Sequence, residues 1–380
     1  MKTKMKNLFT TFLLSLLCVL TFHVTASAAT GTEATIGAKK YSSLQQAVTA
    51  VKNGQTIKLQ KDISISTPVE SKNNVKFTLD LNKHKITTPK SKYKVMDDGS
   101  KMTGSFRIFK GNVTIVNGTF GNYAAIKAEK DATLTLKGGT YWQLINFGKT
   151  TVSNAKFINK WYAASYNYAG TLSISNTAMK AHGNCIYAVN GKLITKAGSY
   201  QPYSSQSKYP QIAVEKASVS ISGGTFTSNH NVIYNNNGKV SISGGTYKAT
   251  SSAPGLYNDN GTMTVKSGTF SASNTNAVCN ANGSLTISGG TFKNKSDRYA
   301  TFYCGENSKT VIQQGTVSNA GSAHAIDAEW IKKFVLSGGT FKSNNTESTP
   351  IWIYKSVIDG QSAQISIAKK YQKQVTQVFS

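Results

Sequence analysis

Short runs of alternating hydrophobic and polar residues recur along most of the chain, about every 22 residues. The clearest copies are Ile221–Phe226, Ile242–Tyr247 and Ile287–Phe292, which read ISGGTF, ISGGTY and ISGGTF. Each copy joins apolar residues to a Gly-Gly turn, a threonine and a final aromatic residue, here called the anchor. Looser copies have their anchors at Phe120, Tyr141, Phe270 and Phe341.

This alternation predicts short strands with apolar residues facing inward and Ser, Thr or Lys facing outward. A propeller blade is longer than this period, and a leucine-rich repeat would need a leucine signature and a helical half. The pattern therefore predicts an all-β chain that forms a single right-handed parallel β-helix of about 22-residue coils.

A second short strand in each coil ends in Asn-Gly at 190–191, 237–238, 260–261 and 282–283, with Asn307 in the same register. Glycine supplies the positive φ that the Gly-Gly turn before each anchor requires. Equivalent residues of successive coils stack about 4.8 Å apart. We therefore expect these asparagines to form a ladder of side-chain amides, with a structural role.

Both ends of the chain carry further signals. Lysines at 2, 4 and 6, an apolar run over 8–24 and a small-residue site at 26–28 predict a signal peptide over residues 1–28. A membrane anchor is the alternative, but no later stretch is apolar enough to span a membrane, so we predict no transmembrane segment. Residues 29–62 are expected to form an N-terminal cap with an amphipathic helix after Ser43, and residues 63–380 the β-helix. The protein is thus predicted to be secreted, and extracellular or associated with a cell surface.

Several of these segments together resemble the pectin-lyase-like superfamily, and most closely its secreted repeat proteins from Gram-positive bacteria. They are Tyr41–Val48, Gly54–Leu59, Phe77–Asn82 and the SGGTF repeats. The resemblance implies the β-helix fold. It leaves activity open, because the superfamily contains polysaccharide lyases, glycoside hydrolases and adhesins.

Members that cleave polyuronates typically use a calcium site of clustered Asp and a basic residue on the outer face of one sheet. Here the corresponding outward positions are Ser, Thr or Lys, as at Thr135, Lys137, Ser220 and Ser222. Calcium prefers several oxygen ligands that include carboxylates. We therefore predict no cofactor, with calcium kept only for the case of a lyase, and we name no catalytic residue. Two carboxyl groups that the fold brings within about 5 to 10 Å of each other would still allow a glycosidase.

Histidine and cysteine were considered as metal or redox sites. His182, His230 and His324 lie in coils too far apart to share one ion, so we interpret them as surface residues and predict no metal site. Cys279 and Cys304 each precede an anchor by the same number of residues, which predicts stacked cysteines. They form either a disulfide or two free thiols, and the state of Cys185 is also open.

The remaining signal is charge, because the chain has 43 Lys and Arg against 16 Asp and Glu, a formal net charge of +27. Such a field attracts polyanions, although solubility alone would also explain it. Five lysines share one repeat position: Lys149, Lys192, Lys239, Lys309 and Lys333. Lys248, Lys293 and Lys342 form another such set, and Tyr187, Tyr234 and Tyr257 share a position on the second strand.

These rows favour a secreted, non-catalytic protein that binds an anionic polysaccharide or cell-wall polymer, as an adhesin or matrix protein would. Lysine would attract the charge, Ser and Thr would donate hydrogen bonds, and Tyr would contact sugar rings. The alternative is a polysaccharide lyase or glycoside hydrolase acting on an acidic polysaccharide. Nucleic acid is a minor alternative, because the chain lacks a nucleic-acid-binding motif. The oligomeric state is left open.

Overall fold

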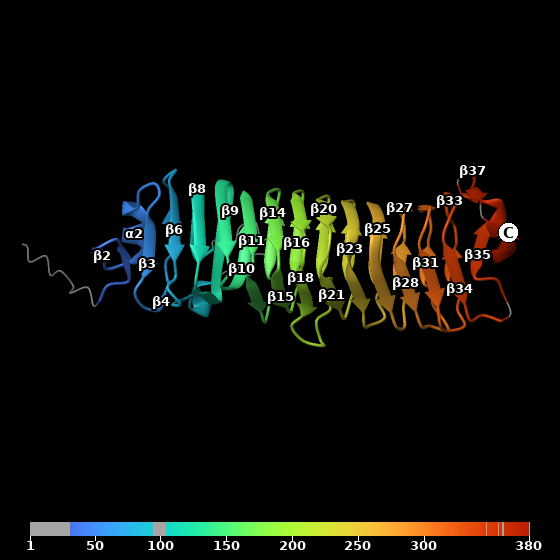
Figure 1. Cartoon of the computed structure of the whole chain (residues 1–380), viewed down its shortest axis with the longest axis horizontal. Coiled ribbons are helices and arrows are strands. Elements are labelled where there is room, and N and C mark those ends of the chain that lie inside the picture. The colour runs from blue at the N-terminus through green and yellow to red at the C-terminus, as the bar shows by residue number, and fades with distance from the viewer. Residues whose placement is uncertain (1–30, 94–103, 347, 356, 359–360, 380) are drawn as a thin grey trace, which may run out of the picture.

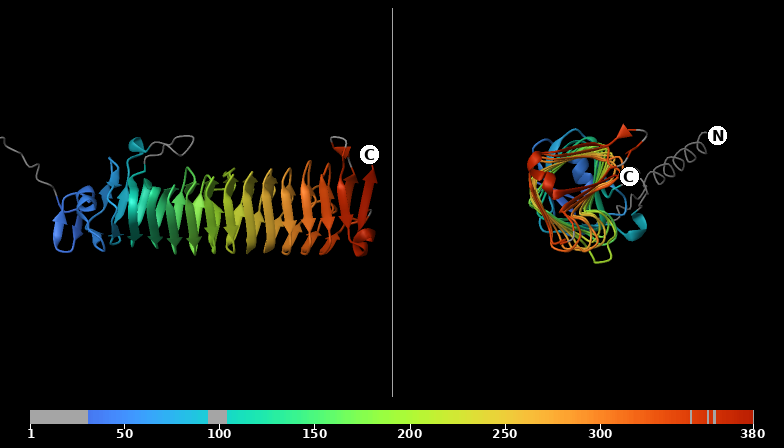
Figure 2. Two further views of the ribbon diagram at one scale, coloured as in Figure 1. Left: turned by 90° about the horizontal axis from the view of Figure 1, so that it is seen from above. Right: turned by 90° about the vertical axis from the view of Figure 1, so that its right-hand side faces the viewer.

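The chain forms an all-β solenoid of about 14 turns, each of roughly 22 residues, in the computed structural model. The structure describes residues 31–93, 104–346, 348–355, 357–358 and 361–379. The predicted signal peptide lies outside these residues. Coils follow one another along the long axis from the N-terminal to the C-terminal end (Figure 1), and they superpose in the end-on view (Figure 2).

Each coil contributes up to three short strands, and each of these pairs in parallel with its counterparts in the coils before and after it. The stacked strands form three faces, which we call the lysine sheet, the tyrosine sheet and the anchor sheet after the residues that recur on them. The lysine sheet contains β3 (Thr56–Leu59), β6 (Lys76–Asp80), β11 (Lys149–Ser153), β14 (Thr171–Ser175), β17 (Lys192–Thr195), β20 (Ser218–Ile221), β27 (Ser284–Ile287), β30 (Lys309–Ile312), β33 (Lys333–Leu336) and β38 (Gln364–Ile367). The tyrosine sheet contains β5 (Val69–Ser71), β13 (Ser165–Tyr168), β16 (Ile186–Val189), β19 (Ile212–Glu215), β22 (Ile233–Asn236), β24 (Leu256–Asp259), β26 (Val278–Asn280), β29 (Phe302–Cys304), β32 (Ile326–Ala328), β35 (Ile351–Lys355) and β39 (Val375–Phe379).

The anchor sheet contains β4 (Ile63–Ser64), β7 (Lys85–Thr87), β12 (Lys156–Asn159), β15 (Thr177–Ala181), β18 (Gly198–Pro202), β21 (Thr225–Ser228), β28 (Thr291–Asn294), β31 (Thr316–Asn319) and β34 (Thr340–Ser343). Five longer strands run through a corner and join more than one sheet: β8 (Phe106–Val116), β9 (Thr119–Lys137), β10 (Thr140–Asn146), β23 (Lys239–Ala249) and β25 (Thr262–Ala272). Along the chain, a tyrosine-sheet strand is followed by a lysine-sheet strand and then by an anchor strand.

The N-terminal end is covered by a short helix, α2 (Leu44–Ala50), which is the amphipathic helix predicted after Ser43. The side chain of Ser43 accepts a hydrogen bond from the backbone N–H of Gln46, which satisfies a free donor of the first turn. Leu44, Ala47 and Val48 are buried, and the helix contacts β1 (Ala34–Ile36), β2 (Lys39–Tyr41), β3 and β5. β3 already pairs in parallel with β6, so the sheets of the solenoid begin within the segment expected to be the cap.

The remaining elements are small. Two 3-10 helices, η1 (Lys90–Lys92) and η2 (Lys369–Gln374), and the antiparallel pair β36 (Val357–Ile358) with β37 (Gln361–Ser362) lie outside the coil strands. The last coil is closed by β38 on β33 and by β39 on β35. Within the described residues, none of the helices reaches the length and apolarity needed to cross a membrane.

The anchors stack inside the solenoid. Tyr200, Phe226, Tyr247, Phe270 and Phe292 are buried, and their neighbouring ring centroids are 4.4 to 4.9 Å apart. The rings lie within 10° of parallel, so each coil presents one flat face to the next. The predicted inward position of the anchors is therefore confirmed.

An asparagine ladder exists, but the residues named for it were wrong. Asn237 and Asn260 instead occupy the left-handed region at the corner, at φ 56° and 55°, and their side-chain amides bond to Asn236 and Asp259. The ladder belongs to asparagines three residues before the turn glycines. The amide nitrogen of Asn235 donates to Asn258 Oδ1 at 2.7 Å, and that of Asn258 donates to Asn280 Oδ1 at 2.8 Å.

The ladder also explains the glycine after each corner asparagine. The amide nitrogen of Asn258 donates to the carbonyl of Gly261 at 3.2 Å, so it closes its own corner as well as bonding to the next coil. A Cβ at Gly283 would lie 2.1 Å from the same nitrogen. Glycine is thus required where the inner amide passes under the turn, and the positive φ of the corner belongs to the preceding asparagine, as at Asn237 and Asn260.

Replacing Asn258 with leucine is expected to lower the free energy of unfolding by about 2 kcal/mol. Leucine has a similar size but leaves Asn280 Oδ1 and the Gly261 carbonyl without this donor. Chemical denaturation of the two proteins measures the difference. Val214 pairs with Asn235 and is the apolar residue at the same repeat position as the ladder asparagines. Val214→Ala therefore provides a comparison that removes packing but no hydrogen bond.

The predicted stacking of Cys279 on Cys304 was also wrong. Cys279 pairs with Tyr303, and Cys304 pairs with Asn280. Neighbouring residues in a strand point to opposite faces, so the two thiols lie on opposite faces of the tyrosine sheet. Residues 279–284 align with the longer stretch 303–309, because one additional turn residue shifts the register.

All three cysteines, Cys185, Cys279 and Cys304, are free and buried. Burial raises the pKa of each thiol to about 12, so all three stay protonated at neutral pH. They behave as small core residues rather than as reactive groups.

Candidate functional site

The five lysines that share a repeat position lie in a single row along the lysine sheet. Strand pairing links them through intervening Thr and Ser residues in the order Lys149, Thr171, Lys192, Ser218, Lys239, Thr262, Ser284, Lys309, Lys333. We call these nine residues the lysine row. At a rise of about 4.8 Å per coil, the row extends over about 38 Å.

The charges of this row are open to solvent and uncompensated. Lys149, Lys192, Lys239 and Lys309 are exposed, and Lys333 is half-buried. Within the part of the chain that the structure describes, none of the five forms a salt bridge. Lys309 and Lys333 are direct register partners, so their like charges repel, and a bound anion would relieve that repulsion.

Two depressions lie where the row meets the asparagine corner. One, of about 430 Å³, is lined by Thr262, Ser284 and Lys309 of the row, and by Asn260, Asn282, Asn307 and Lys332. The other, of about 350 Å³, is lined by Lys149 and Thr171 of the row together with Lys130 and Asp131. Because both depressions follow the same corner, they are separate hollows along one edge of the solenoid rather than one deep pocket.

A second lysine row runs along the anchor sheet. Lys248, Lys293 and Lys342 share a row with Ser271 and Ser318, so lysine and serine alternate from coil to coil. All three lysines are exposed. Two faces of the solenoid therefore carry regularly spaced positive charge.

From β11 onward, the described strands that carry carboxylates belong to the third face. From β11 onward, the described strands of the lysine and anchor sheets contain no Asp or Glu. Outward positions of the tyrosine sheet carry the acids Glu70, Glu129, Glu215, Asp259, Asp327 and Glu329. The sheet that the sequence identified as free of acids is free of them over these coils.

Tyr187, Tyr234 and Tyr257 share a row on the tyrosine sheet, as predicted from their spacing, with Ala213 between the first two. The hydroxyl of Tyr187 donates to Glu215 at 2.6 Å, and that of Tyr234 donates to Asp259 at 3.3 Å. Burial, with a contribution from Glu215, raises the pKa of Tyr187 to about 12. The hydroxyls of Tyr187 and Tyr234 are thus hydrogen-bond donors, and each already donates to a carboxylate of the next coil.

The tyrosine row and the lysine row do not form the one flat surface that the sequence suggested. The strand carrying each tyrosine ends at the asparagine corner, and the lysine begins the next strand beyond it. An anionic polymer on the lysine row would therefore not also lie across the tyrosines. Their sheet offers aromatic faces beside negative charge, which suits a different ligand.

One group of carboxylates surrounds a basic residue on the tyrosine sheet. The guanidinium of Arg107 lies 2.5 Å from Glu129 and 3.9 Å from Glu70, and it also packs over Phe109. Lys127 lies 3.3 Å from Glu129, and Lys72 lies 2.6 Å from Glu70. Both acids are therefore already paired with cations, which is the arrangement of a structural ion-pair network.

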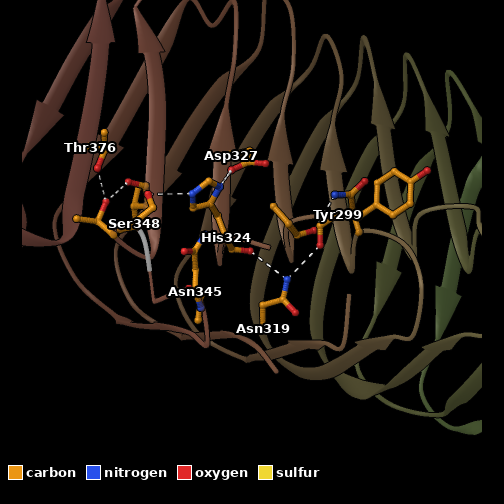
Figure 3. A network of polar contacts seen from close by, with 12 residues as sticks. Tyr299, Asn319, His324, Asp327, Asn345, Ser348 and Thr376 are labelled. Carbon is orange, nitrogen blue, oxygen red and sulfur yellow. Dashed lines mark hydrogen bonds and ion pairs between the residues drawn. The ribbon is translucent and has the colours of Figure 1, made fainter. Parts of the chain in front are cut away.

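The three histidines have different environments. His182 packs against Tyr209, and burial lowers the pKa of His230. His324 instead lies in a polar network with Asp327 and Ser348 (Figure 3). Sequence spacing does not join His324, Asp327 and Ser348, because Ser348 comes from the following coil. Among the described residues, no group of three or more His, Cys, Asp or Glu side chains could hold a metal ion.

Comparison with protein families, curated proteins and solved structures gives no significant match.

Proposed function

We propose that this protein is an exported right-handed β-helix protein of the pectin-lyase-like kind that binds a linear anionic polymer without cleaving it. The supporting observation is the lysine row: among the described residues, its five lysines form no salt bridge, and the strands of their sheet contain no carboxylate from β11 onward. The predicted signal peptide would bring this surface into contact with acidic polysaccharide or cell-wall polymer.

The geometry favours a polymer over a small ligand. Lys149, Lys192 and Lys239 follow one another every second coil, which is about 10 Å. A chain with regularly spaced anionic groups can occupy several such positions at once, and the second contact then benefits from the first. Ser and Thr residues between the lysines provide hydrogen-bond donors for its hydroxyl groups.

The proposal predicts retention of the protein on an immobilised anionic polysaccharide at low salt and its release by about 0.5 M salt, because exposed charges are then screened beyond about 4 Å. A neutral polysaccharide support is the control, and soluble nucleic acid added as a competitor tests the minor alternative. Absent retention, or retention that salt does not change, would contradict the proposal.

Cleavage of an acidic polysaccharide is the second candidate function, supported only by Arg107 between Glu70 and Glu129. It predicts new unsaturated or reducing ends when acidic glycans are incubated with the protein, with or without calcium. Arg107→Lys would abolish such products if the guanidinium took part. Absence of products from a broad panel of glycans would leave binding as the function.

A further inference from the structure

The coil that contains β32 departs twice from the repeat, at positions that face each other. Two residues before the tyrosine-sheet strand, Asn184, Asn231 and Asn276 of other coils donate to a carbonyl of the next coil at 2.6 to 2.7 Å. His324 takes this position before β32. In the row where Tyr303 stands one coil earlier, β32 carries Asp327.

The two departures make direct contact. Nδ1 of His324 lies 2.7 Å from Oδ1 of Asp327, and Nε2 lies 3.1 Å from Oγ of Ser348 (Figure 3). With the ring proton on Nδ1, the nitrogen that faces the carboxylate, Nε2 is left as an acceptor facing the hydroxyl. Hydroxyl, imidazole and carboxylate thus stand in the order that activates a serine nucleophile.

Neighbouring groups restrain the imidazole. The Trp352 ring is nearly parallel to it, at 3° and a centroid distance of 6.0 Å. The backbone N–H groups of Ala325 and Ile326 both donate to the carbonyl of Pro350, at 2.9 and 3.2 Å, which holds the coil of Ser348 against that of His324. These bonds place the backbone at Pro350, two residues after Ser348, against the residues that follow His324.

The arrangement combines a buried carboxylate oxygen with a partly open ring. Oδ1 of Asp327 is buried and, within the described residues, has no hydrogen-bond partner, and Nδ1 of His324 lies 2.7 Å from it as an ion-pair contact. The side chains of His324 and Asp327 are 20% and 22% exposed. The carboxylate thus faces the ring from the interior, while the open ring edge admits a substrate.

We propose that Ser348, His324 and Asp327 form a catalytic triad that hydrolyses carboxylic esters of small acids. Oγ of Ser348 attacks the carbonyl carbon as its proton passes to Nε2 of His324, and Asp327 stabilises the imidazolium. The C–O bond to the alcohol then breaks, and the alcohol oxygen takes the proton from Nε2. Water, deprotonated by the same nitrogen, releases the acid and restores the serine. Ester and water are the only reactants.

This activity is independent of the polymer-binding proposal, because none of the three residues belongs to the lysine row. An ester group carried by a bound polymer would be one source of substrate, and a free ester of low mass would be another. Comparing hydrolysis of an O-acetylated anionic polysaccharide with that of a small acetate ester separates the two sources.

The test uses the mature protein, a fluorophosphonate probe and p-nitrophenyl acetate. The probe is expected to label Ser348, as peptide mapping would show, and labelling should disappear in Ser348→Ala and His324→Gln. Hydrolysis should fall about 1,000-fold, or to the uncatalysed rate, in both variants. Asp327→Asn should slow hydrolysis while the thermal unfolding temperature stays close to that of the wild type.

Ser252→Ala and His182→Gln are the matched controls, because they remove a loop serine and a loop histidine in other coils. Lysine side chains also react slowly with activated acetates, so phosphonate labelling at Ser348 is the decisive measurement. Equal hydrolysis by Ser348→Ala and wild type, or labelling elsewhere, would overturn the proposal and leave the contacts as ties between coils. Replacing the lysine row should leave labelling unchanged, so failure of one proposal is distinguishable from failure of the other.

Discussion

Simultaneous replacement of Lys149, Lys192, Lys239, Lys309 and Lys333 by glutamine is expected to weaken binding to an anionic polysaccharide by about 50- to 100-fold at low salt. Exposed ion pairs contribute roughly 0.5 kcal/mol each, and five together correspond to nearly two powers of ten in the dissociation constant. Titration at low salt and at about 0.5 M salt measures both the loss and its electrostatic origin. At the higher salt, the two proteins should differ little.

A second set of five lysines provides the control. Lys40, Lys52, Lys90, Lys295 and Lys369 are exposed and lie outside the lysine row. Their replacement by glutamine removes the same net charge, so it should weaken binding far less if the row is the site. An equal loss in both variants would mean that affinity follows total charge, and the row would then have no special role.

Replacing Phe226 with alanine is expected to lower the free energy of unfolding by about 3 to 5 kcal/mol. Its ring lies between Tyr200 at 4.4 Å and Tyr247 at 4.9 Å, so alanine leaves a cavity that opens onto two neighbouring coils. The strands β18 and β23, which pair with β21 on either side, limit collapse into that space. Denaturant unfolding measures the loss, and hydrogen exchange should show it concentrated around β21.

Thr227→Ala is the matched change, because Thr227 follows Phe226 in β21 but points outward and is half-buried. This variant should shift stability by no more than about 0.5 kcal/mol. If both substitutions had similar effects, the aromatic stack would not be the main contact between these coils.

The fold was largely predictable, because each coil repeats the same inward and outward alternation. The row of five lysines was also predictable, since strands of equal register convert a fixed sequence spacing into a straight line. The asparagine ladder was misplaced because at least two asparagines precede the turn glycine in three of these coils, before Gly238, Gly261 and Gly283. The inner asparagine is the one that crowds the turn glycine of the next coil, as at Gly261 and Gly283. The visible signal was the asparagine three residues before these three glycines.

The cysteine pair failed for a related reason. Counting back from the anchors places Cys279 over Cys304, but the additional residue lies between Tyr303 and Lys309, so the count changes inside the coil. Ser348, His324 and Asp327 could not be joined from spacing, because loop residues meet according to loop conformation rather than strand register. The sequence feature that could have indicated this contact is that one coil differs from the repeat at two positions. It has His324 where other coils have asparagine, and Asp327 in the tyrosine row.

The direction of the hydrogen bonds between coils has a mechanical consequence. Because these bonds run along the solenoid axis, tension between its two ends loads the coil-to-coil interfaces in series, and the weakest interface yields first. The pair of β4 with β7, which joins only Ile63 to Ile86 and Ser64 to Thr87, is among the shortest. A polymer lying along the lysine row would cross many of these interfaces and carry part of the force. A bound chain would therefore reinforce the solenoid against extension.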